Sequence, residues 1–344
     1  MKNGIYTLAN DVVYDQLVAL LNSIEVNAGR EIPVCVIPYD NRLEKVRAEI
    51  ATRNNVTLFE NNSSINRWED FSTQAWKSHH RAQKAWQTKG LPPVYRLAMH
   101  RKLCAFDGDF EKFIYFDADT LLIGSVDNVY QQLNTYDWVA NDFQYKSDLK
   151  YIFDGPPELL EQVFGQEKLK SGIFCAGWFA GNKGVFNEAR LENILNQLKA
   201  GEADVMALGG PDQSLFNYMV LRSDISYYNF CYDNLENTPG NHWSSNFTEV
   251  ENVLYDQGRR LTYLHYMSVP SSKFTSLCQG EDVDIPYKEI FLHYRYLKSP
   301  ESRPKVFTQP SSFAKLQKST SDFVSQKASN IMHKYRQLQN LKNL

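Results

Sequence analysis

One apolar stretch that ends in two carboxylates constrains this chain more than any other feature of its sequence. Residues 113–119 read Phe-Ile-Tyr-Phe-Asp-Ala-Asp, and the sequence becomes apolar again directly after Thr120. An uninterrupted hydrophobic run of this length predicts a strand that is covered on both faces, as in a parallel sheet. Open α/β sheets bind their ligands at the carboxyl ends of such strands. The two aspartates therefore stand where a ligand would lie.

The spacing of Asp117 and Asp119 indicates a metal site. Side chains two positions apart on an extended chain point the same way, so both carboxylates can converge on one hard cation, and Ala118 leaves room between them. Asp-x-Asp also occurs in ordinary turns and helix caps. However, clustered carboxylates repel each other unless a cation or strong donors compensate them, and a solvated turn is not usually bracketed by apolar runs.

The order of segments along the chain favours an α/β fold. Residues 4–8 and 32–37 read as strands on either side of an amphipathic helix, which is the opening of a βαβ unit and implies a parallel sheet. Residues 61–90 are polar and read as a helical or irregular insertion. Further segments continue the alternation: a helix near 43–53, a strand at 56–59, a helix at 94–106, a strand at 138–142, a glycine-rich apolar run at 172–181 and a helix at 214–221.

Composition limits the class of protein. The chain has 344 residues and a net charge of -3, which argues against a general nucleic-acid binder. Its aromatic fraction of 13% suits surfaces that hold sugars. Five scattered cysteines suggest neither a zinc cluster nor a disulfide framework. No apolar run reaches membrane-spanning length and no signal peptide is evident, so we expect a cytoplasmic protein.

The composition changes near the end of the chain, where we expect a separate segment at 306–344 after a main domain at 1–305. Residues 311–344 carry six lysines or arginines against one acidic residue, with apolar residues at helical spacing. Such a basic amphipathic helix could lie on the inner face of an anionic membrane or pack against a partner. A helix that is docked on its own domain or frayed in solution explains the pattern at least equally well.

Taken in order, the motifs resemble those of the family 8 glycosyltransferases, which have the GT-A fold and include glycogenin and bacterial lipooligosaccharide galactosyltransferases. Residues 7–14 are similar to the first strand and loop of that family, and Asp117-Ala118-Asp119 is similar to its metal-binding Asp-x-Asp. Residues 212–217, Asp-Gln-Ser-Leu-Phe-Asn, resemble its Asp-Gln-x-x-x-Asn element. Residues 264–266, Leu-His-Tyr, resemble the late strand that delivers a histidine to the metal. The resemblance covers roughly residues 4–275.

The resemblance implies a Rossmann-like, mixed and mostly parallel sheet flanked by helices, followed here by a C-terminal helical extension. It also implies roles for individual residues. Mn²⁺ or Mg²⁺ would be held by Asp117, Asp119 and His265. Gln213 and Asp212 would act at the reacting sugar, with Gln213 a polar stabiliser because an amide is neither a nucleophile nor a base. The donor would be bound by Thr7, Leu8, Ala9, Asn10, Tyr14, Lys102, Ala118, Asp142 and Lys273.

This sequence departs from the family pattern at two places. Cys175-Ala176-Gly177 stands where the family usually has Asn-x-Gly against the donor sugar, so one hydrogen bond to that sugar is missing or supplied elsewhere. The glycine that follows the family's histidine is absent, and Lys273 lies eight positions after His265 rather than close by. In addition, residues 292–294 repeat the Leu-His-Tyr triplet, so His293 stays open as an alternative to His265.

The resulting prediction is a metal-dependent, retaining glycosyltransferase. It would transfer a sugar from a nucleoside diphosphate sugar, with a UDP-sugar the first choice, to a glycan, lipid-linked or protein acceptor. Two alternatives stay open. An inactive nucleotide-sugar-binding or scaffold protein is motivated by Cys175 and the basic tail. A sugar nucleotidyltransferase shares the α/β pattern but normally opens with a glycine-rich phosphate loop, and residues 7–14 contain no glycine.

Overall fold

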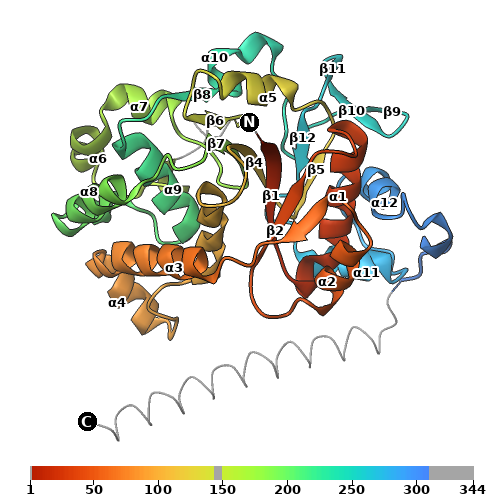
Figure 1. The fold of residues 1–344 in the computed structure, drawn as a ribbon, viewed down its shortest axis with the longest axis horizontal. Coiled ribbons are helices and arrows are strands. Elements are labelled where there is room, and N and C mark those ends of the chain that lie inside the picture. Colours follow the sequence, from red (N-terminus) through yellow and green to blue (C-terminus); the bar gives the residue numbers. More distant parts are fainter. Residues whose placement is uncertain (1, 143–148, 310–344) are drawn as a thin grey trace, which may run out of the picture.

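The structure, a computed structural model, describes residues 2–142 and 149–309. Its centre is a seven-stranded sheet in the order β3-β2-β1-β4-β7-β6-β8 (Figure 1). All neighbouring strands in this sheet are parallel except where β7 pairs with β4 and with β6. The strands are β1 (Asn3–Ala9), β2 (Val34–Pro38), β3 (Val56–Leu58), β4 (Lys112–Asp117), β6 (Trp138–Ala140), β7 (Trp178–Asn182) and β8 (Tyr227–Asn229).

The central strands are buried on both faces, as the apolar run predicts. In β4, Phe113 and Tyr115 pack into one core while Ile114 and Phe116 pack into another. This division follows from the two-residue period of a strand, whose successive side chains point to opposite faces. The sheet therefore needs helices on both sides, and the chain provides them.

The larger core lies under the helices on the left and lower left of Figure 1. In α3, Trp68, Phe71 and Ala75 recur at helical spacing and are buried against the sheet. The side chain of Asn61 caps this helix by accepting a hydrogen bond from the backbone amide of Ser64. The elements of this side are α3 (Asn62–Lys77), α4 (His80–Thr88), the 3₁₀ segment η2 (Leu97–Phe106), α6 (Pro157–Phe164), α7 (Gln166–Ser171), α8 (Glu188–Lys199), η5 (Glu202–Val205) and α9 (Pro211–Arg222).

The opposite face is covered by α1 (Tyr14–Asn27), α2 (Glu44–Ala51) and α5 (Asp127–Gln132). The buried stripe of α1 includes Leu17, Leu20, Leu21 and Ile24, at the spacing that the amphipathic pattern predicts. The predicted βαβ opening is confirmed by the parallel pairing of β1 and β2 around this helix. The insertion at residues 61–90 is helical, because it forms α3 and α4.

A third core joins the carboxyl edge of the sheet to the last described helices. Here β5 (Thr120–Leu122) pairs antiparallel with β12 (Tyr263–His265), and α11 (Ser271–Cys278) and α12 (Lys288–Arg295) pack nearby. A small separate sheet is formed by β9 (Thr248–Val250), β10 (Val253–Asp256) and β11 (Arg259–Arg260). The remaining short elements are η1 (Asp11–Val13), η4 (Leu149–Tyr151), α10 (Phe230–Asp233), η6 (Leu235–Asn237) and η7 (Pro300–Ser302).

Of the predicted tail, only residues 306–309 belong to the described chain, where Thr308 bridges to Glu281 beside α11. The predicted amphipathic helix at 311–344 lies outside the described residues, so the domain boundary near residue 305 stays a prediction. Within the described residues, no helix combines the length and the hydrophobicity that crossing a membrane requires.

Candidate active site

The candidate site forms where β4 ends. Asp117 is the last residue of β4, Asp119 lies in the turn to β5, and β12 places His265 directly opposite Thr120 of β5. One ligand atom from each of Asp117, Asp119 and His265 lies within 4.8 Å of the other two. Strand pairing thus brings together an Asp-x-Asp pair and a histidine that are distant in sequence.

Backbone and side-chain contacts fix Asp117 in this cluster. Tyr115 donates its hydroxyl to Asp117 Oδ1 at 2.6 Å, and the Asp117 amide donates to the carbonyl of Gly177 at 2.8 Å. A Cβ at position 177 would lie 2.4 Å from His265 Cε1 and 3.2 Å from Asp117 Oδ2. Only a glycine at this position leaves the side chains of His265 and Asp117 in place.

Lys102 is buried beside the cluster and is fully engaged by protein acceptors. Its ammonium lies 3.2 Å from Asp117 Oδ1, 3.0 Å from Asp212 Oδ2 and 3.1 Å from the carbonyl of Ala176. An ammonium group has three N–H donors, so these three acceptors use all of them. Burial lowers the pKa of Lys102, but Asp117 and Asp212 more than offset it and the net shift is upward. The lysine therefore stays charged and joins two carboxylates.

The electrostatics of the other cluster residues follow from burial and from their neighbours. Burial raises the pKa of Asp117, and Lys102 only partly offsets that effect. For Asp119 the favourable charge of His265 outweighs burial, so its pKa is lowered. His265 Nε2 lies 3.5 Å from Asp119 Oδ1, and this carboxylate raises the pKa of His265 well above its usual value in spite of burial. Two neighbouring carboxylates are thus kept in different electrostatic environments.

Asp212 and Gln213 open helix α9, whose first residue is Pro211. Asp212 is buried and held by Lys102, whose charge lowers the pKa of this carboxyl against the effect of burial. Gln213 is partly exposed, one position further along. The unpaired amides of the first turn give this end of the helix a partial positive charge, which favours anions in front of it.

Asp142 and Cys175 are joined at the next strand end. The amide of Cys175 donates to Asp142 Oδ1 at 3.1 Å, and the backbone of Asp142 is tied to the side chain of Asn229. The Cys175 thiol lies 3.8 Å from the sulfur of Met267. The backbone of the buried Cys175 therefore binds Asp142, while its thiol contacts Met267.

The end of β1 lies beside the cluster because β1 and β4 are parallel neighbours, with Leu8 opposite Asp117. Thr7 and Ala9 are buried, and Asn10 caps η1 while its amide donates to Asp40 at 2.9 Å. Ala118, between the two aspartates, is buried as well. The predicted donor-binding residues at 7–10 and 118 therefore share one edge of the sheet with Asp117.

Two predicted donor-binding residues have other contacts. Tyr14 lines a cavity of about 460 Å³ formed by α1, α2, α11 and α12, where its ring lies 5.5 Å from the guanidinium of Arg295 and its hydroxyl donates to Glu49. Lys273 is exposed on α11 and donates to the carbonyl of Asp284 at 3.1 Å. In the described part of the chain, no hydrogen bond or ion pair joins either residue to the cluster.

The choice between the two repeated triplets is also a matter of placement. His265 lies in the cluster, whereas His293 is in the last turn of α12 and stacks edge-on against Tyr294. Among the described residues, the one group of three or more histidine, cysteine or acidic side chains close enough to share an ion contains His265. The geometry therefore favours His265 as the histidine ligand.

Sequence analysis missed two residues beside His265. His242 forms a parallel bridge with His265, because Asn241 accepts the His265 amide at 2.7 Å and Trp243 donates to the His265 carbonyl at 3.2 Å. Ser268, three positions after His265, has a left-handed backbone with φ of 67°. No local pattern marks His242, since its partner His265 is 23 positions away. For Ser268 the sequence does contain a signal, because the glycine that follows the histidine in the family is absent here.

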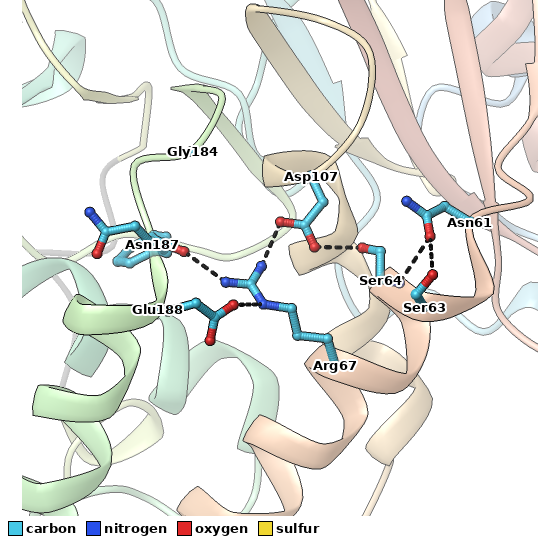
Figure 2. A pocket seen from close by; sticks show the side chains of 9 residues that line it. Asn61, Ser63, Ser64, Arg67, Asp107, Gly184, Asn187 and Glu188 are labelled. Atoms are coloured by element: carbon cyan, nitrogen blue, oxygen red, sulfur yellow. Dashed lines mark hydrogen bonds and ion pairs between the residues drawn. The ribbon is translucent and has the colours of Figure 1, made fainter.

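A second polar cluster lies at the opposite edge of the sheet. Figure 2 shows Arg67 of α3 reaching Asp107 at 2.6 Å and Glu188 at 2.7 Å, in a cavity of about 440 Å³. Asp107 precedes β4 and Gly184 follows β7, and these strands run antiparallel, so both residues stand at the amino end of β4. Ser64 and Trp68 also donate to Asp107, at 2.7 and 2.8 Å.

The Asp117, Asp119 and His265 cluster fits a divalent ion. Ligand atoms about 2.1 Å from an octahedral ion lie about 3 Å apart when adjacent and about 4.2 Å apart when opposite. The three ligand atoms, all within 4.8 Å of one another, reach this spacing with a small approach of their side chains. Two carboxylates and one imidazole form a ligand set that suits Mn²⁺ or Mg²⁺, whereas structural zinc is usually held by several thiolates. Gly177 keeps the space between His265 and Asp117 clear of a side chain.

No protein-family model and no curated protein sequence matches this chain. Among solved structures, the galactosyltransferase LgtC in complex with donor and acceptor sugar analogues is similar with a TM-score of 0.53. That match has 14% sequence identity and covers 86% of this chain and 96% of LgtC. Mouse xyloside xylosyltransferase 1 has a TM-score of 0.46 at 10% identity, covering 67% of this chain and 85% of its own.

The bifunctional glycosyltransferase WbbM has a TM-score of 0.48 at 14% identity, covering 85% of this chain and 49% of its own. Scores below 0.5 do not establish a common fold, so the assignment depends on LgtC. The mixed, mostly parallel seven-stranded sheet with helices on both faces agrees with it. The chain thus has the GT-A fold of that galactosyltransferase, which confirms the fold that the sequence motifs predict.

Proposed function

We propose that the chain is a metal-dependent, retaining glycosyltransferase that uses a nucleoside diphosphate sugar, with a UDP-sugar as the first choice. The observation that carries the proposal is the convergence of Asp117, Asp119 and His265 at the carboxyl end of β4, within the GT-A fold. The fold alone does not specify a reaction. The cluster adds a site suited to the diphosphate of a sugar nucleotide.

Asp117, Asp119 and His265 would hold Mn²⁺ or Mg²⁺ in this function. When bound, such an ion acts as a Lewis acid that stabilises the negative charge on a departing diphosphate. Thr7, Leu8, Ala9 and Asn10 end β1 next to Asp117 and would line the nucleoside side of the site. Tyr14 and Lys273 stay candidates for donor contacts only if they leave the partners described above.

The residues on the other side of the cluster would orient the donor sugar. Lys102 holds the carboxylates of Asp117 and Asp212 in fixed positions, so Asp212 can accept hydrogen bonds from sugar hydroxyls without first being ordered. Asp142 would do the same beside Cys175. Gln213 would place its amide near the reacting carbon at the positive end of α9.

The acceptor would be a glycan, a lipid-linked molecule or a protein. Acceptor sites are built from loops that vary between proteins of one fold. We place the acceptor site at residues 61–90, which form α3 and α4, and at residues 233–255, which include the segment beside His265.

Donor binding and hydrolysis across a panel of nucleotide sugars, with and without Mn²⁺, test the proposal. We expect one donor to bind and to be hydrolysed slowly, and both properties to require the metal. Asp119→Asn should weaken Mn²⁺ binding at least tenfold because it removes one charged ligand. Asp70→Asn, which changes an exposed carboxylate on α3, is the matched control and should bind Mn²⁺ normally.

Three results would distinguish the alternatives. If no nucleotide sugar binds and Asp119→Asn leaves Mn²⁺ affinity unchanged, the proposal is wrong. If a nucleotide sugar binds but is neither hydrolysed nor transferred, the chain is a binding or scaffold protein. If the products from sugar phosphates and nucleoside triphosphates include pyrophosphate, the chain is a nucleotidyltransferase.

A further inference from the structure

The lysine closest to the cluster has no N–H left for a ligand. All three donors of Lys102 are used by Asp117, Asp212 and the carbonyl of Ala176. Lys273 is exposed on α11 and donates to the carbonyl of Asp284, and among the described residues no hydrogen bond or ion pair joins it to the cluster. A departing diphosphate gains negative charge, and preorganised N–H donors around it stabilise that charge. The site that the proposed function requires therefore needs a donor other than these two lysines.

His242 lies where such a donor is needed. Its parallel bridge with His265 makes it the next residue sideways from β12, on the side away from β5. Paired residues of neighbouring parallel strands are about 4.8 Å apart and point to the same face. The His242 side chain therefore lies on the face where His265 meets Asp119. It is partly exposed, so a ligand can reach it.

The hydrogen bonds of His242 indicate which nitrogen carries its proton. The backbone amide of Ser244 donates to His242 Nδ1 at 3.2 Å, and the Ser244 hydroxyl lies 2.8 Å from the same atom. Nδ1 is therefore the acceptor, and in a neutral imidazole the proton then lies on Nε2. Among the described residues, Nε2 has no hydrogen-bond partner. The adjacent Trp243 stacks on the ring at 5.4 Å and anchors its own N–H on the Met267 carbonyl.

We propose that His242 is a diphosphate-binding residue of this site, and that its Nε2–H donates a hydrogen bond to an oxygen of the terminal phosphate. The inference depends on the proposed function, because it presupposes a nucleoside diphosphate at the Asp117, Asp119 and His265 cluster. His242 would supply the phosphate with a hydrogen-bond donor on the side of β12 that faces away from β5. Neither Lys102 nor Lys273 provides a donor there.

The comparison of UDP with UMP binding tests this role, because the two ligands differ only by the terminal phosphate. Calorimetric titration in Mn²⁺ gives the ratio of their affinities for each variant. His242→Phe keeps a ring but has no N–H, so we expect the preference for UDP over UMP to fall roughly tenfold, the effect of one hydrogen bond to a charged group. His242→Gln places an amide N–H near the position of Nε2 and should retain most of the preference.

Controls separate this contact from damage to the site. Mn²⁺ alone should bind His242→Phe as it binds the wild type, which shows that His265 is intact. His80→Gln, a change at an exposed histidine of α4, should leave the UDP-to-UMP ratio unchanged. An unchanged ratio in His242→Phe would overturn the inference, as would a raised KM for the acceptor at unchanged UDP affinity. If the wild type itself binds no nucleoside diphosphate, the proposed function fails as well.

Discussion

Carboxylates surround a cation at both ends of β4, at the amino edge of the sheet near Asp107 and at the carboxyl edge near Asp117. The two edges differ in how completely the carboxylates are paired with cations and hydrogen-bond donors. At the amino edge, Asp107 receives donors from Ser64, Arg67 and Trp68, so both of its oxygens are occupied. At the carboxyl edge, three aspartates share Lys102 and the imidazole of His265.

This difference separates a structural cluster from a ligand site. Fully paired polar groups stabilise a single arrangement and leave no capacity for a further ion. Carboxylates in excess of their cations raise one another's pKa and keep lone pairs for a ligand. At the carboxyl edge the surplus carboxylate is largely buried, whereas Glu188, the second carboxylate beside Arg67 at the amino edge, is 84% exposed and therefore solvated. We therefore place the function at the carboxyl edge, although the cavity of about 440 Å³ lies at the amino edge.

The largest expected effect breaks the pairing at the carboxyl edge. Lys102→Met should lower the free energy of unfolding by about 3–5 kcal/mol, because it leaves the buried carboxylates of Asp117 and Asp212 without their cation. A divalent cation at the cluster would compensate part of that charge, so Mn²⁺ should restore part of the lost stability. Urea denaturation with and without Mn²⁺ measures both effects.

Lys77→Met, at an exposed lysine near the end of α3, is the control and should change the free energy of unfolding by less than about 0.5 kcal/mol. A stability loss for Lys102→Met that Mn²⁺ does not reduce would show that the excess charge at this edge is not available to a metal.

A smaller effect is expected at the amino edge. Asp107→Ala leaves the guanidinium of Arg67 and the indole N–H of Trp68 without one acceptor each. Arg67 is 26% exposed and keeps Glu188 as a partner, so water reduces the penalty, and we expect a loss of about 2 kcal/mol. Mn²⁺ should not restore this loss. Equal rescue of Asp107→Ala and Lys102→Met by Mn²⁺ would remove the distinction between the two edges.

The sequence was sufficient for the frame of the site and insufficient for its contacts. The apolar run before Asp117 predicts a central strand, because only burial on both faces explains it, and Asp117 and Asp119 follow at its end. The partners of Lys102 come from three separate segments, so no local spacing reveals that its N–H groups are used up.

Pairing between distant segments also explains why the sequence did not predict the placement of three other side chains. His265 and His293 stand in identical triplets, and only the pairing of β12 with β5 distinguishes them. His242 reaches its position through a loop that pairs with β12, and Tyr14 points into a cavity that four helices create together. Sequence periodicity identifies faces of elements, but it does not say which loop will lie next to which strand.

A third prediction concerns pH and sharpens the contrast between the edges. Asp119 raises the pKa of His265 well above its usual value of about 6.5. In the metal-free chain this pair therefore stabilises the fold below about pH 6.5, and that contribution is lost as the pH rises through the raised pKa. A metal needs the neutral imidazole, so binding must release its proton.

Mn²⁺ affinity should accordingly increase about tenfold for each pH unit from pH 6.5 up to the raised pKa of His265, and then level off. Calorimetric titrations in buffers with different ionisation enthalpies measure both the affinity and the number of protons released. In Asp107→Ala the same slope should be found, because nothing at the amino edge is linked to this proton. A pH-independent affinity would mean that His265 is neutral before the metal binds.

The smallest expected effect comes from the backbone, where the two edges again differ. Ser268 near His265 and Gly184 in the cavity of Figure 2 both have left-handed φ values, 67° and 73°. A side chain in this conformation costs about 1 kcal/mol, whereas glycine adopts it freely but loses more entropy on folding. Ser268→Gly should therefore stabilise the fold by at most about 1 kcal/mol. Gly184→Ser should destabilise it by about the same amount through backbone strain alone, because nothing lies within 4 Å of a Cβ at position 184 and the new side chain meets no clash.

Thermal unfolding of both variants checks the signs. If Ser268→Gly instead lowers stability, contacts of the serine outweigh the strain. Stabilisation by Ser268→Gly together with weaker UDP binding would indicate that the strained turn holds the loop after His265 in a binding-competent position. Strained backbone conformations cluster at binding sites because they preorganise the residues that contact the ligand.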